Sequence, residues 1–569
     1  MSIVSLNEEQ KLAVDYSGHS AIIACPGSGK TTTIVHKACK IMRTNPSVSI
    51  MLVSFTRESA QEIVKRVKAL NASFAKRMEY GTFHSLALRQ VGGLGRFKIA
   101  NDTDRYFVLT RVLKQLNIPA DPFELLGQID RWKTNESLNS LSENEHNILR
   151  QYDELLQKNR SYDYSDILAM ACKNLSEEES KQVKFSHILV DEFQDTDPLQ
   201  YKWLKCNSRA GVKVTVVLDD DQSIYAWRNA MGYHGLIQFE QDYGAKRFVL
   251  SSNYRSHQEI ILSAKSVIEH NKHRSSKNIH SMRGRGGLVE FKSFSTQDGE
   301  HAHILTQLKN IDAQTALLCR TNVHLDRLEA ILSKIQIPYQ RHGGKSIWET
   351  HEVSLYVSML RFLFLNQKIG LTNWLSLLRY PEGEIGRIQK LSVDQALAHL
   401  ANNTIPEMAI KMDFSKRLQA WQRLLERNNQ QGLIYAIYDL ALTICKKNPA
   451  SMRVTWARDA LAEKGEKLVP FIKTLDHRHR TKKEEDDVLL HLHTYHSAKG
   501  LEYDNVFMPY LTEGAIPSNN AIASTNQQAI EEERRLFYVG ITRAIKNVHG
   551  TAYDGAKGIS RFVKEAHLI

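Results

Sequence analysis

The chain has 569 residues, of which 42% are hydrophobic and 24% charged, with 29 Gly and 12 Pro. At about 100 to 200 residues per domain this length indicates several domains, and the composition excludes a mainly disordered, collagen-like or coiled-coil chain. Lysine and arginine (75) exceed aspartate and glutamate (63), which gives a net charge of +12 and favours a polyanionic partner such as nucleic acid.

The cysteines and the apolar runs indicate in which cellular compartment the protein is expected to work. None of the six cysteines forms a CxxC pair, which argues against a disulfide framework or a zinc ribbon and fits a reducing cytoplasm. The chain turns polar within its first ten residues, and no apolar run approaches the roughly 18 residues of a membrane span. We therefore expect a cytoplasmic protein with no signal peptide and no membrane partner.

Short apolar runs with β character alternate with longer helical patterns along the chain. The runs of the first half are 21–24, 50–54, 187–190, 214–218 and 248–250. Those of the second half are 289–291, 316–319, 489–494 and 506–509. This alternation predicts two α/β cores with parallel sheets and crossover helices.

Two strand-poor helical stretches interrupt these cores. The predicted domains are a first core (1–83 and 184–255) with insertion 84–183, and a second core (256–355 and 488–569) with insertion 356–487. Within the second insertion, residues 477–487 are highly charged and lack an apolar period. We expect them to form a solvated linker, with a nucleic-acid contact as the alternative.

A glycine-rich loop follows the first apolar run. The segment ACPGSGKTT (24–32) opens a helical pattern, so Gly27 and Gly29 would let backbone N–H groups surround phosphate oxygens. Lys30 would reach the terminal phosphates, and the Thr31 hydroxyl would ligate Mg²⁺. Since Ala24 stands where the strict P-loop pattern has glycine, a plain strand-to-helix turn is the competing interpretation.

Two adjacent acids complete the expected phosphate chemistry. Asp191 and Glu192 directly follow the apolar run 187–190. One carboxylate can hold Mg²⁺ while the next orients or deprotonates an attacking water. Together with the glycine-rich loop, this pair predicts nucleotide hydrolysis.

The segments DEFQD (191–195) and VLDDDQSIYAWRNA (217–230) resemble superfamily 1 DNA helicases of the UvrD, Rep and PcrA family. The motifs of that family occur in order as LNEEQKLAV, ACPGSGKTT, SFTRESA, GTFHSLA, YDYSDIL, VDEFQD, DDDQSIYAWR, LSSNYRS, ALLCRTN, HGGKSIWE, TYHSAKGLE and EERRLFYVGITRA. The resemblance runs from residue 6 to residue 544 and implies two RecA-like cores with ATP and Mg²⁺ in the cleft between them.

The resemblance also implies roles for individual residues. The expected ATP contacts are Gln10, Gly27, Ser28, Gly29, Lys30, Thr31, Thr32, Tyr254, Gly500 and Glu502. The expected catalytic residues are Lys30, Glu192, Gln222, Arg255 and Arg543, with Thr31 and Asp191 as metal ligands. Gln10 would read the adenine edge and Tyr254 would stack on it, while Gln222 would sense the γ-phosphate. Arg255 and Arg543 resemble arginine fingers.

Single-stranded DNA is the implied polymer partner, because aromatic rings can stack on any base. The expected DNA contacts are Phe55, His84, Tyr225, Trp227, Arg228 and His496. Three positions depart from the family. Thr32 replaces an arginine that often sandwiches adenine, and Leu218 and Asn229 stand where glycines are common.

The predicted function is an ATP-dependent helicase or translocase acting on single strands and on junctions with duplex, with 3′ to 5′ polarity implied by the resemblance. One alternative is an accessory translocase subunit of a nuclease-containing complex, as in Gabija-type phage defence. Another is a non-catalytic DNA-binding scaffold. A nuclease or a repair or replication protein would be the protein partner, and the pathway and oligomeric state stay open.

Overall fold

The computed structural model describes residues 5–92, 97–134, 141–177, 185–209, 211–335, 337–402, 406–407, 413–475, 488–555 and 557–569. The predicted charged linker, 477–487, lies outside them. The chain forms two compact units. The first comprises Met1–Leu288, Pro517–Lys546 and Lys564–Leu568, and the second Val289–Ile516, Asn547–Val563 and Ile569.

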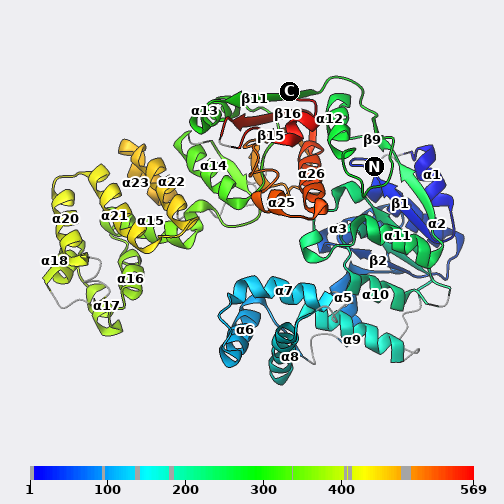
Figure 1. Cartoon of the computed structure of the whole chain (residues 1–569), viewed down its shortest axis with the longest axis horizontal. Coiled ribbons are helices and arrows are strands. Elements are labelled where there is room, and N and C mark those ends of the chain that lie inside the picture. The colour runs from blue at the N-terminus through cyan, green and yellow to red at the C-terminus, as the bar shows by residue number, and fades with distance from the viewer. Residues whose placement is uncertain are drawn as a thin grey trace. The chain divides into compact units, whose positions relative to one another are not determined.

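A six-stranded sheet organises the first unit, in the order β3-β2-β6-β7-β1-β8. Figure 1 labels two of its strands, β1 and β2. Its strands are β1 (Ser20–Ala24), β2 (Ile50–Ser54), β3 (Met78–Thr82), β6 (His187–Val190), β7 (Lys213–Leu218) and β8 (Lys246–Leu250). Every neighbouring pair is parallel. The five apolar runs of the first half are thus confirmed as strands. The more polar β3, MEYGT, was not predicted.

Both faces of this sheet are buried. Along β1, Ala21 and Ile23 point into one apolar cluster and Ile22 and Ala24 into another, as the two-residue period of a strand requires. The helices that pack on the first face are α5 (Phe83–Gln90), α9 (Tyr164–Glu177), α10 (Pro198–Asn207) and α11 (Gly232–Tyr243). Those on the second are α2 (Lys30–Thr44) and α3 (Arg57–Leu70). Such double coverage explains the nearly continuous apolar strands.

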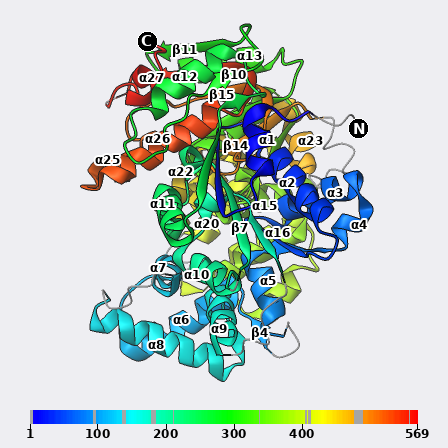
Figure 2. The same cartoon turned by 90° about the vertical axis from the view of Figure 1, so that its right-hand side faces the viewer.

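A helical group interrupts the first sheet between β3 and β6. It contains α6 (Asp102–Leu116), α7 (Pro122–Thr134), α8 (Glu143–Lys158) and α9, with the short pair β4 (Lys98–Ile99) and β5 (Ser161–Tyr162). Figure 2 shows these helices gathered at one end of the unit. Leu109, Ile129 and Tyr152 are fully buried in a separate apolar cluster, so the group has a core of its own.

The second unit contains another six-stranded sheet, in the order β11-β16-β15-β12-β14-β13. Its strands are β11 (Leu288–Phe294), β12 (Thr315–Cys319), β13 (Tyr339–Arg341), β14 (Leu490–Thr494), β15 (Tyr503–Met508) and β16 (Ala544–Tyr553). The strands β15, β12, β14 and β13 pair in parallel. The four apolar runs of the second half are confirmed, whereas β13 and β16 were not predicted.

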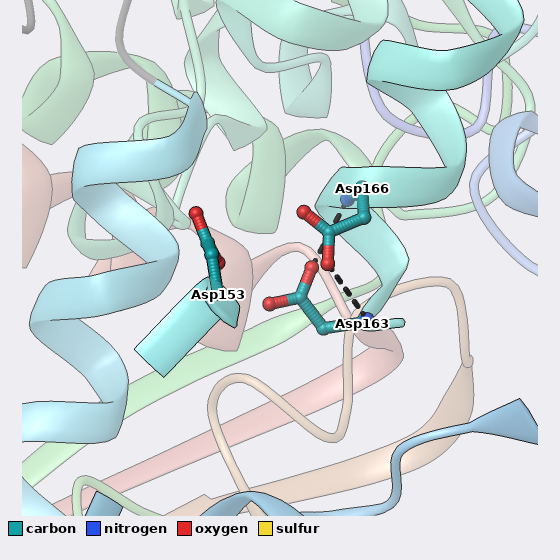
Figure 3. A group of neighbouring side chains, drawn as sticks. All are labelled: Asp153, Asp163 and Asp166. Atoms are coloured by element: carbon teal, nitrogen blue, oxygen red, sulfur yellow. Dashed lines mark hydrogen bonds between the residues drawn. The ribbon is translucent and has the colours of Figure 1, made fainter. Parts of the chain in front are cut away.

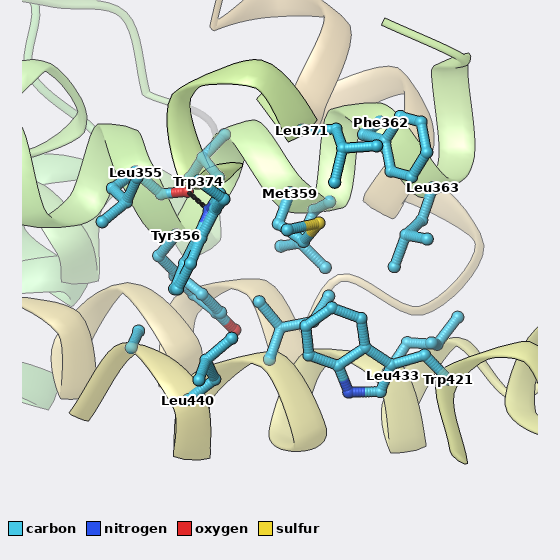
Figure 4. Packing of buried hydrophobic residues seen from close by; sticks show 14 of the residues in the cluster. Leu355, Tyr356, Met359, Phe362, Leu363, Leu371, Trp374, Trp421, Leu433 and Leu440 are labelled. Carbon is cyan, nitrogen blue, oxygen red and sulfur yellow. Dashed lines mark hydrogen bonds between the residues drawn. The ribbon is translucent and has the colours of Figure 1, made fainter. Parts of the chain in front are cut away.

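A second helical group lies between β13 and β14. Its core joins α15 (His351–Leu365) and α16 (Lys368–Leu377) to α20 (Phe414–Glu426), α21 (Gln430–Ile444) and α22 (Ala450–Ala462). Figure 4 shows this packing, in which the Trp374 indole donates to the Leu355 carbonyl at 2.8 Å. The Tyr356 hydroxyl donates to the Ile434 carbonyl at 2.9 Å. These bonds satisfy the polar atoms of two buried rings.

The structure confirms the predicted α/β class with two sheet cores, each interrupted by helices. The domain boundaries stay a prediction, and the compact units group residues 256–288 and 517–546 with the first sheet. None of the helices in the described ranges combines the length and apolarity needed to cross a bilayer.

Candidate nucleotide and DNA site

The predicted site residues of the first unit gather at one edge of its sheet. Segments 25–29, 191–192, 219–222 and 251–255 directly follow β1, β6, β7 and β8. Parallel strands end on the same side of a sheet, and ligands of such folds bind in the crevice there. Residues far apart in sequence are therefore brought together.

The glycine-rich loop has the backbone that its sequence predicts. Gly27 and Gly29 have φ values of 64° and 79°, in the left-handed region that favours glycine. A Cβ on Gly27 would lie 2.6 Å from the Arg255 Cβ, and one on Gly29 would lie 2.8 Å from the Gln10 amide nitrogen. The loop thus packs directly against a predicted ATP contact, Gln10, and a predicted catalytic residue, Arg255, and α2 begins at Lys30.

Lys30 pairs with the predicted general base. Its Nζ lies 2.9 and 3.0 Å from the two carboxylate oxygens of Glu192. Burial alone would lower the pKa of Lys30, but the carboxylates of Glu192, Asp219 and Asp191 raise it, so this lysine stays charged. Glu192 has a left-handed φ of 53°, a strained conformation that recurs at functional sites.

Asp191 offers an oxygen suited to a hard cation. Its side chain is buried, and within the described residues its Oδ1 has no hydrogen-bond partner. Burial and the neighbouring Glu192 raise the pKa of Asp191 to about 7. A carboxylate at this position and the hydroxyl of Thr31 are the oxygen ligands that Mg²⁺ prefers, so these two residues fit the metal that the fold implies.

A chain of buried polar contacts joins the acids to Arg543. The Gln222 amide donates to Asp219 at 2.5 Å, and Arg543 donates to the Gln222 oxygen at 3.0 Å. Gln194 connects Asp219 to the base, because it accepts from the Asp219 N–H at 3.1 Å and donates to Glu192 at 2.5 Å. Sequence reasoning did not single out Gln194.

The two arginines lie close enough to repel each other. Arg255 donates from Nη1 to the carbonyl of Thr542 at 3.3 Å, next to Arg543. Arg543 is 1% exposed, and burial together with the charge of Arg255 lowers its pKa to about 9. Two guanidinium groups in such a position would be stabilised by an anion between them.

The predicted adenine contacts are held together before any nucleotide is bound. Gln10 forms a capping box with Asn7 at the start of α1 (Glu8–Asp15), and its amide donates to the Ser28 carbonyl at 3.0 Å. The Asn7 amide donates to the Tyr254 hydroxyl at 2.9 Å, while the Tyr254 ring is 42% exposed. Thr32 lies in the first turn of α2.

The predicted DNA rings form a cluster at the same edge. Phe55 and Tyr225 stack with centroids 5.5 Å apart and planes 19° from parallel, and Tyr225 meets Trp227 edge-on at 6.4 Å. Trp227 is 57% exposed, and the Arg228 guanidinium lies 5.4 Å from its ring centre. An exposed tryptophan beside a cation suits base stacking.

His84 adds a neutral ring to this surface. Burial and the nearby charge of Arg228 lower its pKa to about 4, so it is uncharged at neutral pH. Its ring meets Tyr164 edge-on at 5.2 Å, and Tyr164 is 53% exposed. Sequence reasoning missed Tyr164, although its place in the motif YDYSDIL was a usable signal.

Two groups of three aspartates have the spacing of a metal site, but each surrounds a lysine. Asp153, Asp163 and Asp166 converge in Figure 3. Lys133 lies 2.8, 2.8 and 2.5 Å from them. The group is therefore an internal ion cluster, and it supports no metal site.

The same arrangement recurs in the turn after β7. Lys277 lies 2.8, 2.8 and 2.7 Å from Asp219, Asp220 and Asp221, and all four side chains are fully buried. Arg274 adds a second cation on Asp221 at 2.8 Å. No local sequence pattern pointed to Lys277, because its partners lie more than fifty residues away.

Three predicted contacts belong to the second unit. His496 and Gly500 lie in the turn that follows β14, and Glu502 directly precedes β15. They are not among the residues gathered at the edge of the first sheet.

A parallel sheet with a glycine-rich loop, its lysine, paired carboxylates, one buried and one half-buried arginine at one edge defines a P-loop nucleoside triphosphatase. Comparison with known families identifies the family within this class. Residues 6–244 match the UvrD/REP helicase N-terminal domain, and residues 248–551 match the UvrD-like helicase C-terminal domain. The chain belongs to the UvrD/REP helicase family, a family of ATP-dependent DNA helicases.

Curated relatives match over nearly the whole chain. The ATP-dependent DNA helicase PcrA of Staphylococcus epidermidis is 28% identical over 95% of this chain and 82% of the relative. DNA helicase II of Salmonella typhimurium is 28% identical over 96% and 84%. A probable DNA helicase II homolog of Rickettsia conorii is 27% identical over 98% and 93%.

Proposed function

We propose that this chain is a motor that hydrolyses ATP with Mg²⁺ to move 3′ to 5′ along single-stranded DNA and to open junctions with duplex. One observation carries the proposal. Gln222 accepts a hydrogen bond from Arg543 at 3.0 Å and ends the 3₁₀ turn Asp220–Gln222, and the next 3₁₀ turn, Ala226–Arg228, carries Trp227 and directly follows Tyr225. A single segment thereby links the phosphate edge to the ring cluster.

At the nucleotide, each residue of this edge has a chemical task. Lys30 and the loop N–H groups would bind phosphate oxygens, and Glu192 would accept a proton from water. Thr31 and Asp191 would hold Mg²⁺, which neutralises charge on the phosphates when bound. Arg255 and Arg543 would stabilise the transition state, and their mutual repulsion supports a site for anionic oxygens.

The remaining roles follow the resemblance. Gln10 and Tyr254 would contact adenine, while Phe55, His84, Tyr225, Trp227 and Arg228 would contact DNA. The roles of His496 in DNA binding, and of Gly500 and Glu502 in ATP binding, stay predictions. A reducing cytoplasm is proposed because all six cysteines are free thiols.

The polarity is tested by unwinding of two matched duplexes, one with a 3′ single-stranded tail and one with a 5′ tail. The 3′-tailed duplex is expected to open with ATP and the 5′-tailed duplex to stay closed. Glu192→Gln is the matched control, since it keeps the shape of the base but cannot accept a proton. Opening of the 5′-tailed duplex alone would contradict the polarity. ATP-driven movement without opening of either duplex would favour the accessory translocase, which needs a protein partner to unwind.

The ring cluster is tested by a salt titration of single-strand binding. Trp227→Ala is expected to cost about 1 to 3 kcal/mol at every salt concentration, because stacking does not release counterions. Arg228→Gln is expected instead to flatten the slope of log K against log salt by about 0.7, as one phosphate contact is lost. Unchanged affinity in Trp227→Ala would remove this ring from the DNA site.

A further inference from the structure

The turn that carries Tyr225, Trp227 and Arg228 ends at an unusual residue. Asn229 follows the 3₁₀ turn Ala226–Arg228 with a φ of 60°, a left-handed conformation that glycine adopts freely and asparagine tolerates best among other residues. The asparagine keeps that backbone and adds an amide side chain.

This amide reaches the helical insertion. The Asn229 Nδ2 donates to the Arg131 carbonyl and to the Thr134 hydroxyl oxygen, both at 2.9 Å. Arg131 and Thr134 lie in the last turn of α7, where backbone carbonyls lack N–H partners from the helix itself. The Arg131 carbonyl also lies 3.3 Å from the Thr134 hydroxyl. The Thr134 hydroxyl donates its own proton to the Asp130 carbonyl at 2.8 Å, which leaves its oxygen to accept from Asn229.

The other end of the turn is held separately. The Ala226 N–H donates to a carboxylate oxygen of Glu532 at 3.0 Å, and Glu532 lies on α26 (Gln527–Ile541), the helix that precedes Arg543. The ring cluster is thus fixed on one side to the helix that leads to the nucleotide site and on the other to α7. The Asn229 amide joins the turn to α7 through two donated hydrogen bonds.

We propose that Asn229 is a positioning residue that fastens the base-stacking turn, residues 225–229, to α7, so that the grip of Trp227 on single-stranded DNA depends on the helical insertion. The inference rests on the proposed DNA role of this turn. It assigns the insertion a task in single-strand binding that acts through α7.

The test compares two substitutions of left-handed asparagines. Asn229→Gly keeps the backbone conformation and removes both donated bonds. Asn117→Gly is the matched control, since Asn117 ends α6 of the same insertion at a φ of 54° and is exposed. Anisotropy of a labelled oligothymidine should show affinity about three- to tenfold weaker for Asn229→Gly, the range expected for hydrogen bonds of this kind. Asn117→Gly should bind as the unchanged chain does.

A steady-state measurement separates positioning from general damage. In Asn229→Gly the single-strand concentration giving half-maximal ATPase stimulation should rise by the same factor, while the ATPase rates without DNA and at saturating DNA stay unchanged. A lower saturated rate with an unchanged half-maximal concentration would overturn the inference, because Asn229 would then act on the nucleotide site. If DNA did not stimulate the unchanged chain at all, the motor proposal would fail. The binding curves alone would then decide on Asn229.

A double-mutant cycle identifies the partner. Thr134→Val removes one acceptor while keeping the branched shape, so it should give part of the Asn229→Gly effect. The double variant should be no weaker in DNA binding than Asn229→Gly, since contacting residues give non-additive effects. Full additivity of two measurable single effects would overturn a role that acts through α7.

Discussion

Arg543→Ala is expected to lower DNA-stimulated ATPase activity by about 10³- to 10⁵-fold, the range associated with arginine fingers. Arg543 is 1% exposed and contacts Gln222, so its charge faces the phosphate edge in a region of low dielectric. Nucleotide binding, measured by fluorescent ATP analogue titration, should survive. The rate is measured in steady state with saturating single strands.

Two further variants serve as controls for this measurement. Arg543→Lys keeps the charge but not the planar fork, so it should recover only part of the rate. Arg66→Ala, on the exposed face of α3, removes an arginine that forms an ion pair with its helical neighbour Glu62 and should leave the rate unchanged. Normal hydrolysis by Arg543→Ala would remove this residue from the catalytic site.

Lys30→Ala is expected to reduce ATPase activity at least about a hundredfold, because it removes a preorganised cation from the phosphates. Single-strand affinity should survive, since the ring cluster does not include Lys30. Lys40→Ala in the same helix removes an exposed lysine paired with Asp15 and serves as the control. Activity of Lys30→Ala near that of the control would contradict the nucleotide site.

The ion pair between Lys30 and Glu192 adds a further expectation to this experiment. Residues that act as one catalytic unit give non-additive losses. Combining Lys30→Ala with Glu192→Gln should therefore cost little more than the more damaging single change. A fully multiplicative loss would show that the two residues contribute independently.

The elements that a sequence can predict here are those with local patterns. The strands β1, β2, β6 and β7 contain nearly continuous apolar runs because both sheet faces are covered, and the glycine-rich loop is contiguous. By contrast, β3 lies at the sheet edge and reads MEYGT, with only Met78 and Gly81 buried, so it lacks an apolar run.

The site residues also divide into those that a local sequence pattern predicts and those that it does not. Lys30 and Asp191 follow directly from local motifs. Gln222 and Arg543 are 321 residues apart, and only the family resemblance predicted that they share a site. The contacts of Lys277 and Asn229 could not be predicted from the sequence, since their partners lie on other elements. Side-chain contacts across a fold leave no periodic trace in a sequence.

The buried ion cluster around Lys277 has a consequence for how salt acts on this enzyme. Asp219, Asp220, Asp221 and Lys277 have fully buried side chains, so mobile ions cannot enter to screen their attraction. Arg228 and Trp227, which would contact DNA, are exposed to solvent. Rising ionic strength should thus release the DNA while the turn that connects it to the phosphate edge keeps its shape. The protein would dissociate from DNA at high salt while the contacts between this turn and the phosphate edge stay intact. Lowering the salt concentration would then restore DNA binding and movement without any refolding.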